Sequence, residues 1–388
     1  MPPITVDDPT EELASLRQTA RAFCDDEVRP GARDRDRDES FPADLVNKMA
    51  EVGFLGAAIP EEYGGMGLDA HGYQVIIEEI GAADSSMRSL ISVNLGLFSM
   101  SLLKWGTDDQ KERWLPGCAN GELGAFGLTE PDAGSNPSQM RSRAEKVDGG
   151  WRINGSKVYI TNGSLGAVTM IFARAFKDGE DLGITCFLTP QDAEGYDGKQ
   201  IHGKLGLRSG DTAEIALTDV VVGDDAVLGE VGGGMKVALS ALDNGRFSLS
   251  AGCVGTCREA LEVALDYAAE REQFGKKIAG FQLVQELLAQ IHVDYSAAKA
   301  LVDKVAVKKA AGERFTQEVS TAKLFSTEAA VRCADNAVQI HGGHGYIDEY
   351  PVQRMLRDAR VTTLYEGTSQ IQHLILGRML TGVSAFNG

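Results

Sequence analysis

The sequence has no CxxC pair, no run of basic residues and no signal-like leader. Its six cysteines are spread along 388 residues, and only Cys253 and Cys257 lie as close as four positions apart. This spacing favours reduced, buried thiols over a disulfide framework or a zinc site. Without a Lys/Arg-rich segment, a net charge of −18 argues against a nucleic-acid partner, because a phosphate backbone would meet a like-charged field.

Long hydrophobic runs are also scarce. The longest uncharged apolar stretch lies between Arg88 and Lys104 and contains Asn94 and several serines. We expect it to be too short for a bilayer and to form a buried helix, so no membrane span is predicted. The first residues carry neither a basic nor an apolar leader segment, which favours a cytoplasmic protein over an exported one.

Proline is absent between Pro190 and Pro351. Helices can run uninterrupted through such a stretch because no proline breaks their hydrogen bonds. Apolar residues recur there at helical spacing, as at Leu261 and Leu265, which predicts a C-terminal bundle of antiparallel helices. Similar spacing near the N-terminus predicts helices around residues 13–23, 45–52 and 73–80.

The middle of the chain has a different pattern. Short runs of β-branched and aromatic residues predict strands at 151–153, 157–161, 168–175, 184–188 and 214–222. Turn signals, including Asp148-Gly149-Gly150 and Asn154-Gly155, predict hairpins between them. We therefore expect an N-terminal α-helical domain (1–123), a middle β-domain (124–232) and a C-terminal helical domain (233–388).

Three short segments invite other interpretations. Residues 65–70 fit GxGxxA, but no βαβ unit surrounds them, which favours a turn that caps a helix over a dinucleotide site. His341 and His344 flank two glycines without further ligands nearby, which favours a tight turn over a metal site. The alternating charges of residues 33–38 are typical of a solvated surface segment.

Three loops mix glycine and polar residues beside apolar runs. Residues 126–135 offer hydroxyls and backbone N–H groups that could surround phosphates or a polar ring, or form a simple turn. Tyr159 and Thr161 lie two apart and share a strand face, which also suits an edge strand. Glu366 precedes a glycine and a Thr-Ser pair, where Thr368 or Ser369 could cap a helix.

The order and spacing of these segments resemble the acyl-CoA dehydrogenase family over essentially the whole chain. Four further motifs carry the resemblance, at residues 60–67 (PEEYGGMG), 270–275 (EREQFG) with 281–282 (FQ), 339–343 (QIHGG) and 365–370 (YEGTSQ). It implies a mainly α fold with a middle β-barrel or sheet domain and a C-terminal four-helix bundle. It also implies FAD and a homotetramer built as a dimer of dimers.

Members of this family oxidise an acyl thioester to its trans-2-enoyl form. A carboxylate removes the α-proton while the β-hydrogen leaves as hydride to flavin N5, and the resemblance assigns that base to Glu366. The family's second location for the base falls at Gly245, which has no carboxylate. The base should lie in an apolar pocket that raises its pKa, and its backbone N–H should help to hold the enolate oxygen.

The resemblance also assigns cofactor residues in two groups. Residues expected around the flavin are Phe126, Leu128, Thr129, Gly134, Ser135, Tyr159, Ile160 and Thr161. Thr368 and Gln370 are expected to complete the contacts on the adenosine side of FAD. Tyr159 stands where the family usually has Trp, which keeps an aromatic wall. Residues expected to reach the FAD of a neighbouring subunit are Arg271, Gln273, Phe274, Phe281, Gln282, Gln339, Gly342 and Gly343.

Substrate positions implied by the resemblance are Ser135, Asp243, Arg246, Tyr365 and Gly367. Bulky residues between Leu90 and Leu97 favour a short or branched acyl group, although a packed core helix would look the same. The leading hypothesis is an acyl-CoA dehydrogenase of lipid metabolism that is reoxidised by electron-transferring flavoprotein. The alternatives are an enzyme for acyl groups tethered to a carrier protein and a non-catalytic or DNA-binding relative.

Overall fold

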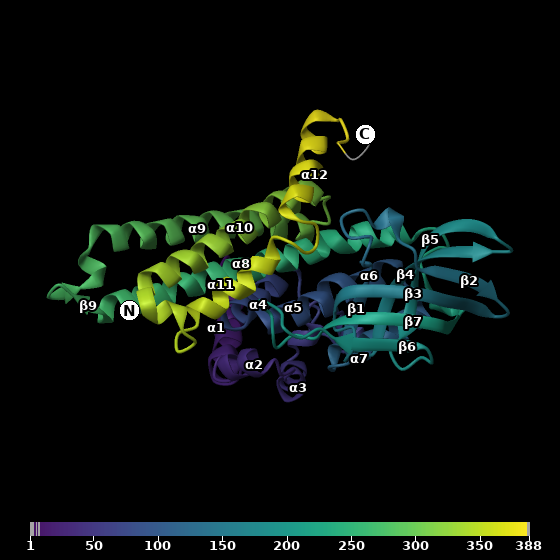
Figure 1. Ribbon diagram of the computed structural model, residues 1–388, viewed down its shortest axis with the longest axis horizontal. Helices are drawn as coiled ribbons and strands as arrows, with labels where there is room; N and C mark the ends of the chain where they lie inside the picture. The colour runs from purple at the N-terminus through teal and green to yellow at the C-terminus, as the bar shows by residue number, and fades with distance from the viewer. Residues whose placement is uncertain (1–3, 5, 7, 386–388) are drawn as a thin grey trace.

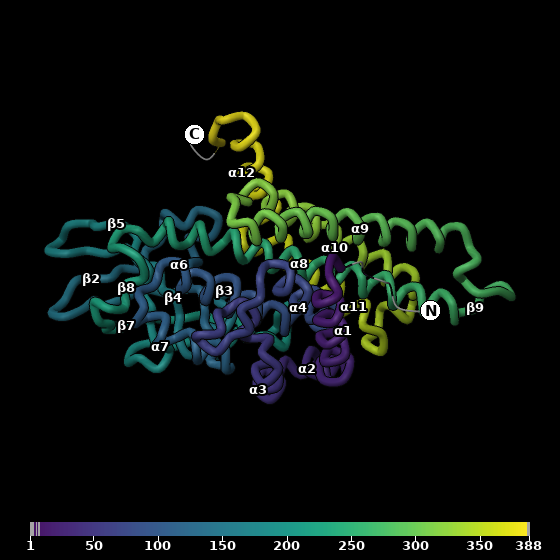
Figure 2. Tube along the Cα trace, turned by 180° about the vertical axis from the view of Figure 1, so that it is seen from behind, coloured from purple at the N-terminus to yellow at the C-terminus, as the bar shows by residue number. Residues whose placement is uncertain are grey.

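The computed structural model describes residues 4, 6 and 8–385 and shows an elongated molecule (Figure 1). A β-sheet occupies one end, the hairpin of β9 (Glu272–Gln273) and β10 (Lys276–Lys277) occupies the other, and long helices run between them. The view from behind shows the same order along the long axis (Figure 2). This confirms the predicted class, with helices first, a middle sheet and helices again.

Seven α-helices form the N-terminal part of the described chain. They are α1 (Glu11–Phe23), α2 (Ala32–Asp38), α3 (Ala43–Glu51), α4 (Ala70–Ala83), α5 (Ser85–Ile91), α6 (Met100–Trp105) and α7 (Asp108–Ala119). The three helices expected from apolar spacing are α1, α3 and α4. Asp69 caps α4 by accepting from the backbone N–H groups of His71 and Gly72. Residues 65–70 are therefore a helix-capping turn, as favoured over a dinucleotide site.

The apolar stretch after Arg88 is part of a longer helical segment than expected. A π-helical segment, Ser92–Ser99, joins α5 to α6, so the helix runs through Ser85–Trp105 and has 21 residues. The expectation that it is too short for a bilayer is wrong, since its length and composition suffice. The expected burial is confirmed, because 89% of its apolar window is inside the protein, as in the core helix of a soluble protein.

The middle part folds as one eight-stranded sheet in the order β6-β7-β3-β2-β4-β5-β8, with β1 paired in parallel to β4. Its strands are β1 (Gly124–Gly127), β2 (Arg143–Val147), β3 (Gly150–Thr161), β4 (Val168–Lys177), β5 (Glu180–Pro190), β6 (Tyr196–Gln200), β7 (Thr212–Gly223) and β8 (Val227–Leu228). Neighbouring strands are mostly antiparallel, and β2 also runs parallel to β4. The sheet has its own core, which includes Trp151, Ile160 and Phe187.

The predicted hairpin turn at Asn154-Gly155 is wrong. Both residues lie inside β3, where the pairing with β7 shifts register between Ile153 and Gly155. A β-carbon at Gly155 would lie 2.2 Å from Ser142 Oγ, so the glycine serves a close approach of two chains. Glycine in a strand marks a bulge as readily as a turn, and the sequence pattern does not separate the two.

The C-terminal part is helical. It comprises α8 (Gly234–Glu270), α9 (Gln282–Ala310), α10 (Thr316–His341), α11 (Val352–Thr362) and α12 (Ser369–Thr381). The helices α8, α9 and α10 run side by side along the molecule (Figure 1). Residues 33–38 lie in α2, and four of the six are exposed, as expected of a solvated segment, but Asp36 is buried and receives two bonds from Arg357. The Asp36 carboxylate is thus buried in an ion pair, although the alternating charges of this segment predict that it is exposed to solvent.

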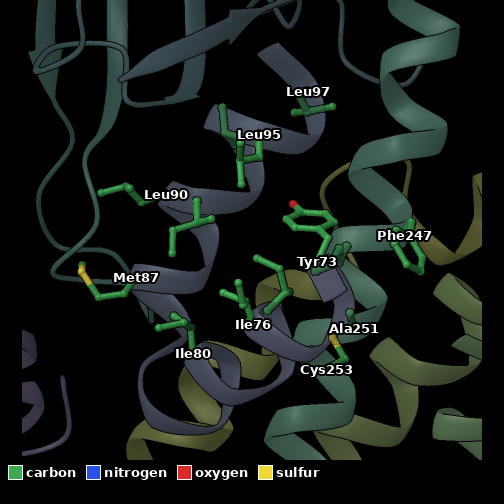
Figure 3. Packing of buried hydrophobic residues seen from close by; sticks show 14 of the residues in the cluster. Tyr73, Ile76, Ile80, Met87, Leu90, Leu95, Leu97, Phe247, Ala251 and Cys253 are labelled. Atoms are coloured by element: carbon green, nitrogen blue, oxygen red, sulfur yellow. The ribbon is translucent and has the colours of Figure 1, made fainter. Parts of the chain in front are cut away.

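One apolar core joins the two helical parts. Figure 3 shows α4 and the Ser85–Trp105 segment facing α8, with Tyr73, Leu90 and Leu97 on one side and Phe247 and Cys253 on the other. The backbones of α4 and α8 approach closely there, and only glycine fits: a β-carbon at Gly81 would lie 2.6 Å from the carbonyl oxygen of Gly252. The N-terminal and C-terminal helices therefore form one packed unit, and the loop before α12 reaches this unit.

Candidate active site

Glu366 lies in the short loop between α11 and α12. It has a left-handed backbone with φ of 54°, and Gly367 follows with φ of 88°. Thr368 then caps α12 by accepting from the backbone N–H of Ile371 at 3.3 Å. A left-handed glutamate is uncommon and is held only where surrounding contacts impose it.

Side chains from three helices hold this turn by its carbonyl oxygens. The Glu366 carbonyl accepts from Arg246 Nε of α8 at 3.2 Å and from Gln372 Nε2 of α12 at 3.4 Å. The Gly367 carbonyl accepts from Lys323 Nζ of α10 at 2.8 Å and from Gln372 Nε2 at 3.1 Å. The backbone of the turn is thereby fixed while the carboxylate stays free.

The Glu366 carboxylate is positioned to act as a base. Its Oε2 is buried and has no hydrogen-bond partner. Burial raises the pKa of Glu366 to about 7, against the opposing charges of Arg88, Arg246 and Lys323. A carboxyl with such a pKa is matched to proton transfer near neutral pH.

Gly245 lies directly against this carboxylate. A β-carbon at Gly245 would lie 2.4 Å from Glu366 Oε2 and 2.6 Å from Leu97 Cδ2. The two positions that the family resemblance gives for a base therefore adjoin the same space, and here the Glu366 side chain fills it. On the α4 side, Tyr73 and Ser248 share a hydrogen bond of 2.7 Å.

Arg88 is a component of the site that the sequence analysis missed. Its exposed fraction is 2%, and its Nη2 donates to the Tyr365 hydroxyl at 2.8 Å. Among the described residues it forms no ion pair, although it lies near enough to influence Glu366. Gly252 makes room for it, since a β-carbon there would lie 2.5 Å from Arg88 Cδ. One arginine at the start of an apolar run gives no signal in the sequence.

The predicted substrate residues fall in two places. Asp243 and Arg246 form an ion pair of 3.0 Å on α8, and Thr316 Oγ1 donates to Asp243 at 2.7 Å. Arg246, Tyr365 and Gly367 adjoin Glu366, and Asp243 is linked to this group through Arg246. Ser135 belongs to an exposed loop of the β-domain.

A buried ion pair holds the loop of predicted flavin residues. Lys157 Nζ of β3 lies 2.7 Å from Glu130 Oε1, and Glu130 also accepts from the backbone N–H groups of Arg141 and Ser142. Burial opposes ionisation of Glu130, but Lys157 and these donors lower the pKa of the carboxyl below its usual value. The loop from Leu128 to Ser142 is therefore anchored at both ends while its middle is open to solvent.

The first group of predicted flavin residues fits a flat aromatic cofactor. Tyr159 has an exposed fraction of 71% and a φ of 60°, Thr129 and Thr161 are half-buried, and nothing lies within 4 Å of a β-carbon built on Gly134. An exposed ring beside free hydroxyls suits a flavin. Phe126, Leu128 and Ile160 are core residues whose side chains are buried, so Ile160 offers its backbone only.

The second group lies at the other end of the bundle. Arg271, Gln273 and Phe274 are on the β9–β10 hairpin and exposed, and Phe281 and Gln282 start α9. Gln339, Gly342 and Gly343 end α10 nearby, where Tyr267 stacks on His341 at 4.2 Å. Figures 1 and 2 both place this hairpin opposite the sheet, so one chain does not bring the two groups together. Thr368 and Gln370 lie beside Glu366, at the start of α12.

Two surface cavities of about 420 and 300 Å³ lie beside α3 and α2, and none of the predicted site residues lines them. In the described residues, no group of three or more His, Cys, Asp or Glu side chains could hold a metal ion. His344 instead pairs with the Tyr267 hydroxyl at 2.9 Å.

Three family models match the chain in order. They are the acyl-CoA dehydrogenase N-terminal domain at residues 10–122, the middle domain at 125–220 and the C-terminal domain at 232–381. An acyl-CoA dehydrogenase of Bacillus subtilis is 37% identical over 374 residues, which are 96% of this chain and 99% of the relative.

Solved structures agree with these matches. Butyryl-CoA dehydrogenase from Megasphaera elsdenii is 35% identical with a TM-score of 0.92 and covers 97% of this chain and 100% of its own. A glutaryl-CoA dehydrogenase from Mycobacterium smegmatis in complex with FADH2 is 34% identical, with a TM-score of 0.93 and coverages of 97% and 96%. A prolyl acyl carrier protein oxidase is 30% identical, with a TM-score of 0.92 and coverages of 96% and 100%.

The three-part fold agrees with these matches. The chain therefore belongs to the acyl-CoA dehydrogenase family and is an FAD-dependent oxidoreductase.

Proposed function

We propose that the protein dehydrogenates an acyl thioester between its α and β carbons, with Glu366 as the base that removes the α-proton. The observation that carries the proposal is the free, buried Oε2 of Glu366 on a turn whose backbone is fixed from three helices. Bound FAD would accept the β-hydrogen as hydride. The backbone N–H of Glu366 is available to the thioester oxygen, where enolate charge develops.

The test is anaerobic flavin reduction by acyl-CoA thioesters in wild type and in Glu366→Gln. The glutamine is isosteric but accepts no proton, so we expect normal FAD content and flavin reduction slower by at least about 1,000-fold. Glu112→Gln, the same change at an exposed position of α7 away from the site, is the control and should reduce at the wild-type rate. A Glu366→Gln protein that reduces its flavin normally would show that another group is the base.

The carrier of the acyl group is part of the same proposal. Curated relatives are named as acyl-CoA dehydrogenases, which supports CoA, and one structural neighbour is a carrier-protein oxidase, which keeps the carrier-protein thioester as the alternative. The negative charge of −18 disfavours an acidic carrier protein. One similar solved structure comes from a study of the electron transferring flavoprotein of Acidaminococcus fermentans. This supports such a flavoprotein as the electron acceptor.

Arg88 favours a second, narrower function, the oxidation of a short acyl group that ends in a carboxylate. Its buried guanidinium has no acidic partner among the described residues and lies near the proposed base. A buried cation is stabilised by an anion that arrives with the ligand. Glutaryl-CoA dehydrogenases among the structural neighbours act on a substrate of this class.

Glutaryl-CoA and valeryl-CoA test this function because they share chain length and differ in the terminal carboxylate. We expect wild type to prefer glutaryl-CoA in kcat/KM by at least about tenfold, as a charge-assisted hydrogen bond would give. Arg88→Met should remove that preference, and Arg88→Lys should retain part of it. Equal use of both thioesters by wild type would contradict the narrower function and leave the general one intact.

A further inference from the structure

Lys323 is a buried lysine of α10 with an exposed fraction of 0%, and the reaction proposed above does not use it. Its Nζ donates to the carbonyl oxygen of Gly367, the residue after the base, at 2.8 Å. Among the described residues it forms no ion pair, whereas the other fully buried lysine, Lys157, faces Glu130. A buried ammonium without a carboxylate is costly, so the position calls for a physical reason.

The first reason is the geometry of the turn. Glu366 and Gly367 are both left-handed, so their carbonyl oxygens leave the helical pattern and need donors from elsewhere. Gln372 reaches both carbonyls but at 3.1 and 3.4 Å, and Arg246 reaches only that of Glu366. Lys323 supplies the shortest of these bonds, and a charged donor makes it the strongest.

The second reason is the charge around Glu366. The charged groups that face it are Arg88 of α5, Arg246 of α8 and Lys323 of α10, and Tyr73 of α4 and the adjacent Tyr365 contribute hydroxyls. Arg246 is already paired with Asp243. Among the groups that raise the pKa of Lys323, Glu366 contributes most, followed by Cys253 and then by Glu328. The attraction between the Lys323 ammonium and the Glu366 carboxylate is therefore only weakly offset by other carboxylates.

We propose that Lys323 is a positioning residue for the base, which pins the Glu366–Gly367 turn through the Gly367 carbonyl and keeps the Glu366 carboxylate ionised in its apolar surroundings. The inference rests on the proposed function, because it assigns Lys323 a task only if Glu366 is the base. Burial lowers the pKa of Lys323 itself to about 8, so it remains mostly protonated at neutral pH. It acts through Glu366 and does not contact the reacting atoms.

The effect of the Lys323 charge on Glu366 is tested by titrating Glu366 directly, without substrate. Infrared difference titration of the FAD-loaded protein, each variant against the same variant with Glu366→Gln, follows the protonated carboxyl. We expect wild type to titrate near pH 7, and Lys323→Gln and Lys323→Met to titrate at least about one pH unit higher, a tenfold change in proton affinity. Lys323→Arg should stay within about 0.3 unit of wild type.

The pinning is tested by hydrogen exchange of the segment 364–372 in the same proteins. Lys323→Met should exchange at least about tenfold faster than wild type, because an unpaired carbonyl loosens the turn, and Lys323→Arg should not. Lys309→Gln is the matched control, since Lys309 is a half-buried lysine whose pKa burial lowers to about 8 but which does not face Glu366. It should change neither readout.

Unchanged titration in Lys323→Gln and Lys323→Met, or unchanged exchange in Lys323→Met, would overturn the inference. If the methionine variant does not fold, the titration of the glutamine variant still decides, because glutamine keeps a donor and removes only the charge. Failure of the proposed function has a different signature, namely normal flavin reduction by Glu366→Gln whatever the Lys323 variants do.

Discussion

Glu366 shows how one residue is tuned by opposing effects. Burial disfavours its ionised form, while Arg88, Arg246 and Lys323 favour it, and the balance raises its pKa to about 7. Without the three cations, burial alone would keep the carboxyl protonated and useless as a base at neutral pH. Without burial, the carboxylate would be too weak a base for a carbon acid.

The pKa of Glu366 predicts the pH dependence of flavin reduction. A base must be deprotonated, so the rate should rise tenfold per pH unit below about 7 and level off above it. Single-turnover flavin reduction between pH 5.5 and 9 at roughly saturating acyl-CoA measures this directly. A rate that falls as the pH rises through this range would show that the protonated carboxyl is the active form.

At the scale of elements, a buried ion network joins α1, α4 and α8. Glu79 of α4 has an exposed fraction of 0% and accepts from Arg258 of α8 through both oxygens at 2.5 Å. Arg17 of α1 lies 2.8 Å from the same carboxylate. Burial opposes ionisation of Glu79, but Arg258 and Arg17 lower the pKa of its carboxyl below the usual value. The N-terminal helices are thus fixed on the C-terminal bundle by charge as well as by apolar contact.

Replacing Glu79 should weaken this junction strongly. Glu79→Gln removes the charged partner that Arg258 contacts through both nitrogens, while Arg17 keeps Asp8 and Glu78, and the loss should cost about 3–5 kcal/mol in free energy of unfolding. Glu145→Gln breaks a solvent-exposed pair with Arg143 and is the control, with an expected cost below about 1 kcal/mol. Urea denaturation followed by circular dichroism compares the two. Equal stability of both variants would mean that the network contributes specificity rather than stability.

At the scale of the whole molecule, one chain separates the predicted cofactor residues. Tyr159 and Thr161 lie on the sheet, whereas Arg271 and Phe274 lie on the hairpin at the far end of the bundle (Figure 2). Phe274 has an exposed fraction of 94% and a left-handed φ of 52°. An exposed aromatic residue beside an arginine is typical of an interface, and a second copy of the chain would bring these residues to its FAD.

This arrangement predicts that cofactor binding and assembly are coupled. We expect a homotetramer by light scattering, and we expect Arg271→Ala to weaken FAD binding by about tenfold or more through loss of a charge-assisted contact. Lys277→Ala removes another exposed cation of the same hairpin and should leave FAD affinity unchanged. A monomer that binds FAD as tightly as the tetramer, or an Arg271→Ala protein with wild-type affinity, would contradict the shared site.

The sequence by itself determined the helix–sheet–helix order, because apolar periodicity and the placement of proline and glycine are local signals. It also located Glu366, since the segment 365–370 (YEGTSQ) resembles the corresponding segment of the acyl-CoA dehydrogenase family. Gly155 and Asp36 were misassigned because a bulge resembles a turn and a buried charge resembles a solvated one until the neighbouring chain is present.

Only the tertiary structure decided what surrounds the base. Arg88, Arg246, Lys323 and Gln372 come from four helices and meet at Glu366 and the turn that carries it, although up to 278 positions separate them from it in sequence (366 − 88 = 278). Burial and opposing charge act through space, so the pKa of the base is a property of the packed helices. The sequence names the group that reacts, and the fold sets its proton affinity.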